Sequence, residues 1–204
     1  MPYPDVDFPL ALPIMSDAAA RRDGRMSLDE FLVWRQGREA RHELVDGVPI
    51  EMAAERASHA RIKARVWEAL RDAVERAGVP CEAFTDGMTV PIDEHGASEP
   101  DALVHCGPPI DDDATVVPRP IVVVEVVSPS SVGRDSVAKV DGYFRMPGPR
   151  HYLIVSHDGR RVVHWSRTDD AGEPTVALVP PGPLALDPPG ISVETERFFA
   201  PRAG

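Results

Sequence analysis

The sequence predicts a mixed α/β domain, and three of its segments carry that prediction. Residues 121–127, IVVVEVV, form an almost unbroken run of β-branched side chains, typical of a central strand covered on both faces. Residues 58–77 place their apolar side chains on one stripe of a helix. An Asp-Gly pair joins the apolar runs 42–45 and 48–50, which is a strong hairpin signal. Because 204 residues suit one domain with a hydrophobic core, we expect a mixed sheet flanked by helices, with additional strands at the ends.

The chain should begin with an irregular arm. Residues 1–25 are rich in Pro, Asp and Ala and lack periodicity, so we expect them to be poorly ordered and residues 26–200 to form the folded domain. Ser27 and Glu30 stand at the spacing of a capping box, which predicts that a helix begins there. The hairpin follows this helix along the chain.

The helix expected at residues 58–77 combines its apolar stripe with several basic residues. It should end at Gly78, because glycine often terminates helices. His59 lies on the stripe, whereas Lys63 and the arginines of this segment lie mainly off it. The stripe consists of Ile62, Val66, Leu70 and Ala73.

The second half of the sequence alternates strands with one more helix. Residues 131–145 are expected to be helical and to stop before Pro147 and Gly148. The further strands are expected at residues 88–92, 101–105, 151–156 and 161–167 and near Val176, with turns at 93–96 and 158–159.

Composition excludes several classes of protein. The sequence contains no apolar run that could span a bilayer and no secretory signal, so we expect a cytoplasmic protein. The two cysteines, Cys81 and Cys106, are too few for a disulfide framework and lack metal-site spacing. The motifs of zinc proteases, of serine hydrolases and of nucleotide-binding loops are missing. A net charge of -11 argues against a broad basic face that grips nucleic acid, although bound cations can offset the carboxylates of a metal site.

Glu125 and Asp101 are the candidates for chemistry. Glu125 lies among the valines of the expected central strand, where an unpaired carboxylate is costly to bury. Either a divalent metal ion or a salt bridge to an Arg or Lys would compensate. Asp101 follows Pro100 at the start of an expected strand, and two carboxylates on neighbouring strands can share one hard cation. Alternatively, Pro-Asp simply forms a turn.

Taken in order, these residues resemble the signature of a known family. The similarity is to the Uma-two-type restriction endonucleases of the PD-(D/E)XK nuclease superfamily, and it covers about residues 27–199. It rests on Pro100-Asp101, the run Glu125–Ser131 (EVVSPSS), Asp135, Lys139 and Tyr143, and on Glu43–Gly47, His59 and Tyr152–Val155. The resemblance implies a restriction-endonuclease-like fold and hydrolysis of DNA phosphodiester bonds with Mg²⁺, or alternatively Mn²⁺.

The lysine of the signature departs from the usual superfamily pattern. That lysine normally stands two residues after the acid, on the same strand face, and here the position is Val127. The resemblance implies that Lys139, on the following helix, takes over its role. The alternative is a surface lysine that pairs with Asp135, four residues earlier on the helix.

The resemblance also implies a set of ligands and supporting groups. Asp101 and Glu125 would hold the metal ion, with the carbonyl of Val126 as a third ligand. Glu43 would be a further acidic group of the site. His59 would contact metal-bound water or the phosphate, or else it is a buried histidine satisfied by a backbone carbonyl.

Two other functions remain open at this point. One is a catalytically inactive nuclease fold that serves as a binding or regulatory module, which the acidic charge and Val127 favour. The other is a structural protein in which Glu125 pairs with an arginine. Because many nucleases that cut both strands are dimers, a homodimer is expected for the active enzyme.

Overall fold

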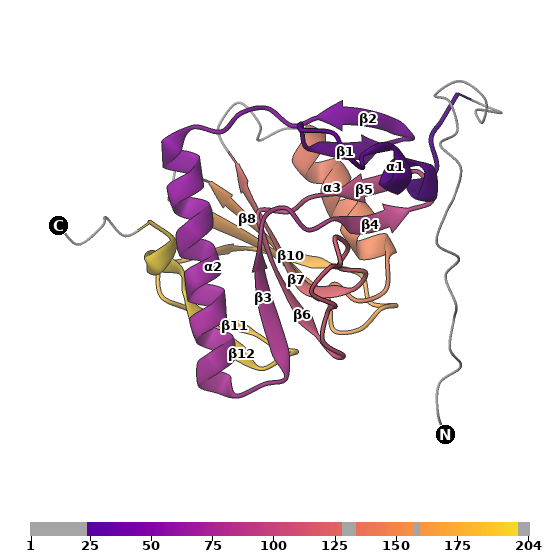
Figure 1. Ribbon diagram of the computed structural model, residues 1–204. Helices are drawn as coiled ribbons and strands as arrows, with labels where there is room; N and C mark the ends of the chain where they lie inside the picture. Colours follow the sequence, from indigo (N-terminus) through magenta and orange to yellow (C-terminus); the bar gives the residue numbers. More distant parts are fainter. Residues whose placement is uncertain (1–23, 128–133, 157–159, 200–204) are drawn as a thin grey trace.

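The computed structural model describes residues 24–127, 134–156 and 160–199 (Figure 1). For residues 134–138 only the backbone is described. Most of the expected N-terminal arm and the expected turn at 158–159 lie outside these residues. In the described part of the chain, no helix is long and apolar enough to cross a membrane.

A six-stranded mixed sheet forms the centre of the fold. Its strand order is β10 (Thr175–Val179), β9 (Arg161–Ser166), β8 (His151–Ser156), β7 (Pro120–Val127), β6 (Ala102–Cys106) and β3 (Cys81–Thr85). The pair β7 and β8 is parallel, and the other four pairs are antiparallel. The parallel pair needs a crossover connection, and α3 (Arg134–Arg145) provides it. The predicted central strand at 121–127 is therefore confirmed as β7.

A second, four-stranded antiparallel sheet lies beside α3 (Figure 1). Its order is β2 (Val48–Glu51), β1 (His42–Val45), β5 (Gly96–Ser98) and β4 (Val90–Asp93). The turn between β1 and β2 has positive φ at Asp46 and Gly47, as the Asp-Gly signal predicts. The backbone of Gly47 is anchored on both sides, because its N–H donates to the carbonyl of His95 and its carbonyl accepts from the N–H of Met26.

The start of α1 (Leu28–Trp34) and the end of α2 (Ala57–Ala77) follow local sequence signals, and the expected helix start at 131 lies outside the described residues. Ser27 caps α1, and Glu30 completes the capping box. Gly78 ends α2 in the left-handed conformation. The C-terminal part adds β11 (Pro183–Leu186), β12 (Ile191–Glu194) and the short helix η1 (Thr195–Phe199), of which the sequence predicted none.

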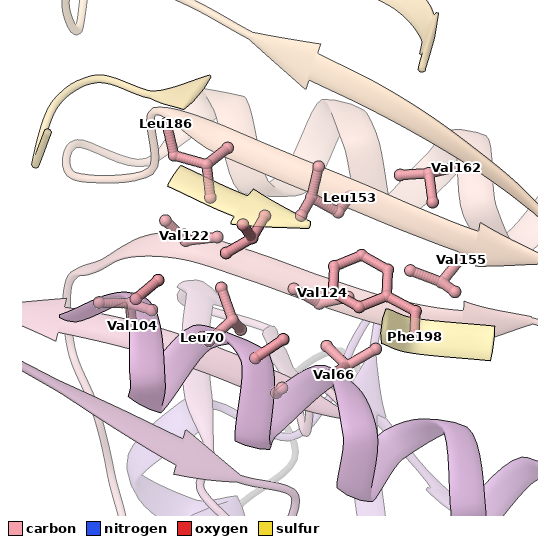
Figure 2. Close-up of a cluster of buried hydrophobic side chains, with 14 of the residues drawn as sticks. Val66, Leu70, Val104, Val122, Val124, Leu153, Val155, Val162, Leu186 and Phe198 are labelled. Atoms are coloured by element: carbon pink, nitrogen blue, oxygen red, sulfur yellow. The ribbon is translucent and has the colours of Figure 1, made fainter. Parts of the chain in front are cut away.

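Two apolar layers cover the two faces of the central sheet. On one face, Figure 2 shows Val66 and Leu70 of α2 gathered with Val122 and Val124 of β7 and with Phe198. On the other face, the second cluster includes Leu103, Val123, Val140, Tyr143 and Tyr152. Strand side chains alternate between faces, so Glu125 shares the face of Val123, towards α3. The apolar surroundings predicted for Glu125 are therefore present.

A disulfide bond joins Cys81 and Cys106. The two cysteines stand directly opposite each other on β3 and β6. Their sequence separation of 25 residues carries no recognisable spacing signal, because strand pairing alone brings them together. The sequence made no prediction about this single bond, because it excluded only a disulfide framework and a metal site at these cysteines.

Candidate active site

Asp101 is fixed at the point where β6 begins. Ala102 pairs with Val124, and extending this register by one residue brings Asp101 opposite Glu125. The backbone N–H of Asp101 donates to the carbonyl of Val124 at 3.0 Å. Its carboxylate oxygen Oδ2 accepts from the backbone N–H of Val126 at 2.6 Å. The backbone of β7 therefore orients the buried carboxylate.

Two side chains of α2 reach the same carboxylate. Nζ of Lys63 lies 3.0 Å from Oδ1 of Asp101, and Nε2 of His59 lies 3.5 Å from Oδ2. Burial would raise the pKa of Asp101, but His59, Lys63 and the Val126 N–H outweigh it and hold that pKa below its ordinary value. Asp101 is therefore an ionised carboxylate at neutral pH. Its charge in turn raises the pKa of His59.

Glu125 is held by side chains of α3. Its Oε1 accepts from Nζ of Lys139 at 3.0 Å and from the hydroxyl of Tyr143 at 3.2 Å. Burial raises the pKa of Glu125 to about 7, because the effect of Lys139 is opposed by Asp101 and Glu43. Glu125 is thus a carboxyl group whose charge depends on a nearby cation.

Lys139 bridges two carboxylates, and the sequence predicted both as site residues. Its Nζ lies 3.0 Å from Oε1 of Glu125 and 2.9 Å from Oε1 of Glu43. Burial lowers the pKa of Lys139, but these two carboxylates more than reverse the effect, so the pKa is raised overall. Glu43 also accepts the backbone N–H of Glu99 at 3.0 Å. The alternative partner, Asp135, has a side chain outside the described residues.

Lys63 was missed as a site residue. The sequence placed it mainly off the apolar stripe, yet it is 6% exposed and contacts Asp101, Asp86 and Glu55. A signal was present in the sequence, because the chain has two lysines among 22 Lys and Arg residues. Both lysines contact the carboxylates of this site.

One group of three metal-ligating side chains occurs within the described residues. It consists of Glu55, His59 and Asp101, whose ligand atoms lie within 4.8 Å of one another. Asp101 was predicted as a ligand, but Glu55 was not considered. The structure joins Val126 to Asp101 through its backbone N–H, and the proposed role of its carbonyl as a ligand stays a prediction.

Comparison with known proteins identifies the family of this chain. The family Uma2, described as putative restriction endonuclease, matches residues 28–196. The chain belongs to the Uma2 family. It is 26% identical to the uncharacterized protein slr1290 of Synechocystis sp. over 147 residues, which are 72% of this chain and 76% of that protein.

The fold is also similar to a solved structure. The crystal structure of a putative nuclease belonging to DUF820 from Anabaena variabilis superposes with a TM-score of 0.67, covering 85% of this chain and 97% of that one. At 16% identity this likeness concerns the fold. The resemblance and the restriction-endonuclease-like fold class predicted from the sequence are both confirmed.

A partly buried ion network connects the candidate active site to the N-terminal part of the domain. Glu99 accepts from Arg41 Nε at 2.7 Å and from Arg35 Nη1 at 3.3 Å. Arg41 also donates to Asp86 at 2.7 Å, and Asp86 contacts Lys63. Arg41, which directly precedes β1, therefore helps to position Asp86, a partner of Lys63.

Proposed function

We propose that this chain is a metal-dependent endonuclease that hydrolyses phosphodiester bonds in DNA. One observation carries the proposal. Two buried carboxylates, Asp101 and Glu125, belong to neighbouring strands, and the ammonium group of Lys139 lies 3.0 Å from Glu125. Carboxylates that converge beside a positive charge can serve metal-assisted attack on a phosphate. Membership in the Uma2 family supports this reading.

The residues of the site fit a hard divalent cation. Mg²⁺ prefers oxygen ligands, which Asp101, Glu125 and the carbonyl of Val126 would provide. Burial raises the pKa of Glu125 to about 7, so a bound cation beside Lys139 would favour its ionised form. The buried hydroxyl of Tyr152 has no hydrogen-bond partner among the described residues, so a polar group in the site would satisfy it. These features support Mg²⁺ or Mn²⁺ as the cofactor.

Each residue of the site has a distinct task in the proposed reaction. When bound, the metal ion would polarise the phosphate and lower the pKa of the attacking water. Lys139 donates hydrogen bonds to the phosphate and stabilises the negative charge that develops there. Glu43 holds Lys139 in position, and Tyr143 holds Glu125. His59, beside Asp101, lies where it can donate a hydrogen bond to the phosphate or to water.

A non-cutting module of the same fold is the second candidate. Val127 occupies the usual lysine position, and the net charge of -11 opposes tight binding of DNA. The position of Lys139 favours the enzyme instead, because its ammonium group reaches Glu125 from α3. The proposal assigns residues 26–200 to the nuclease domain. It also expects a homodimer, and size-exclusion chromatography with light scattering would measure its molar mass.

A cleavage assay on the Lys139→Ala variant tests the proposed function. Removing a preorganised donor from such a site typically slows a reaction by roughly two to three orders of magnitude. We expect wild type to cut plasmid or single-stranded DNA with Mg²⁺ or Mn²⁺, and the variant to lose cleavage while it still folds and binds Mn²⁺. The matched control is Arg145→Ala, because Arg145 lies on the same helix but is exposed and pairs with Asp141.

Two results would count against this assignment. Equal cleavage by wild type and Lys139→Ala removes Lys139 from the mechanism. No cleavage by wild type with either metal favours the non-cutting module.

A further inference from the structure

Lys63 is a buried cation that contacts Oδ1 of Asp101, whereas the backbone of β7 contacts Oδ2. Its Nζ lies 3.0 Å from Oδ1 of Asp101 and 2.7 Å from Oδ2 of Asp86, and it also contacts Oε1 of Glu55. Three carboxylates therefore surround one ammonium group. The side chain is 7% exposed, so water screens these contacts little.

The ammonium group of Lys63 lies beside the three side chains that could hold a metal ion among the described residues. Glu55, His59 and Asp101 bring their ligand atoms within 4.8 Å of one another, close enough to surround a cation. Lys63 already bonds two of these three residues, Glu55 and Asp101. A divalent ion and an ammonium group repel each other strongly at such distances, so they do not occupy this position together.

We propose that the ammonium group of Lys63 permanently fills the cation position among Glu55, Asp86 and Asp101, so that the active site takes one divalent ion and not two. The inference rests on the proposed function, in which Asp101 and Glu125 hold a metal ion. Two-metal nuclease sites place their ions about 3.5–4 Å apart, on the two sides of a shared carboxylate. Here Lys63 supplies the second positive charge from the protein itself.

Lys63 is therefore a positioning residue for Asp101. It engages Oδ1, while Oδ2 accepts the N–H of Val126. This arrangement holds the carboxylate plane in one orientation. An ammonium group cannot activate water as a metal ion does, so Lys63 offsets charge and orients Asp101.

The number of Mn²⁺ ions bound by the protein tests this inference. Calorimetric titration should give one Mn²⁺ for wild type and for Lys63→Arg, which keeps the charge. Lys63→Met should gain a second Mn²⁺, and the double variant Lys63→Met/Glu55→Gln should lose it again. Electron paramagnetic resonance should show an isolated Mn²⁺ in wild type and a spin-coupled pair in Lys63→Met.

The outcomes separate this inference from the proposed function. Two Mn²⁺ ions in wild type, or no additional ion in Lys63→Met, would overturn it. Absence of Mn²⁺ from wild type would refute the metal site at Asp101 and Glu125, but the gain in Lys63→Met would still decide the role of Lys63. If Lys63→Met folds poorly because three carboxylates repel one another, the wild-type stoichiometry and spectrum still distinguish one ion from two.

Discussion

Glu125 shows how a strand can set the charge of a single side chain. The residue stands among valines on β7, and burial raises the pKa of its carboxyl group to about 7. Lys139 and Tyr143 contact one carboxylate oxygen, Oε1. The folded protein therefore holds a proton on Glu125 more tightly than the unfolded chain does.

This shift predicts a pH-dependent stability that depends on Glu125. The stabilising contribution is fully present below about pH 4.5, the ordinary pKa, and is lost as the pH rises through about 7. In the presence of EDTA, the free energy of unfolding of wild type should therefore fall between these pH values relative to Glu125→Gln. One pKa unit corresponds to about 1.4 kcal/mol, so the relative change should reach at most about 3 kcal/mol. Urea unfolding at a series of pH values measures it, and parallel curves for the two proteins would refute the shift.

At this scale the sequence predicts residues that belong to an ordered motif and misses those that tertiary contacts recruit. Asp101, Glu125 and Lys139 could be named because their order resembles a family signature. Lys63 was missed because the helical pattern of α2 does not show that this side chain reaches Asp101, and Glu55 lies before that helix and meets the site through Lys63. The sequence has only two lysines, and this composition signal is separate from the helical periodicity.

The β1–β2 hairpin is the element that carries Glu43 to Lys139. Its turn packs closely, and a Cβ added to Gly47 would lie 2.6 Å from Cβ of Arg25 and 2.9 Å from the backbone N of Met26. Gly47 also has a backbone φ of 78°, which residues other than glycine rarely adopt. The close packing and the positive φ both require glycine at position 47, so the position of Glu43 depends on this residue.

Gly47→Ala should therefore destabilise the protein more than another glycine substitution with the same backbone strain. Gly37→Ala is the matched control, because Gly37 has a φ of 75° but no atom within 4 Å of the added Cβ. Left-handed strain costs about 1–2 kcal/mol in either variant, and the contact with Arg25 and Met26 adds to it in Gly47→Ala alone. Chemical denaturation measures both free energies of unfolding. Equal losses would show that the hairpin moves away from Arg25 without cost.

Elements with strong local patterns were predicted, and elements that depend on a partner were not. The capping box of α1, the stripe of α2 and the valine run of β7 are all visible in the sequence. In contrast, β5 is Gly-Ala-Ser and contains no strand-favouring residue. It becomes a strand because β1 and β4 pair with it on both sides.

On the scale of the whole molecule, the candidate site and the disulfide lie at opposite ends of β6. Asp101 precedes the first residue of this strand, and Cys106 is its last. Cys106 is joined to Cys81 at the start of β3, so the disulfide closes the edge of the central sheet away from the carboxylates. Stability and metal binding should therefore respond separately to reduction.

Reducing the disulfide should lower the stability of the protein without removing its metal site. A crosslink across 25 residues restricts the unfolded chain and contributes about 3 kcal/mol to the free energy of unfolding. For a chain of this size, that loss corresponds to a fall in Tm of about 6–12 °C. We expect a reductant to produce this fall in thermal unfolding while Mn²⁺ binding at 25 °C is unchanged.

The double variant Cys81→Ser/Cys106→Ser is the control for that measurement, because it should already show the lower Tm and ignore the reductant. The Ser side chains keep nearly the same volume at the half-buried positions on β3 and β6, so the missing crosslink is the main change. A reduced wild type with an unchanged Tm would show that the disulfide does not limit the unfolded chain. Loss of Mn²⁺ binding on reduction would instead show that β6 transmits the change along its length to Asp101.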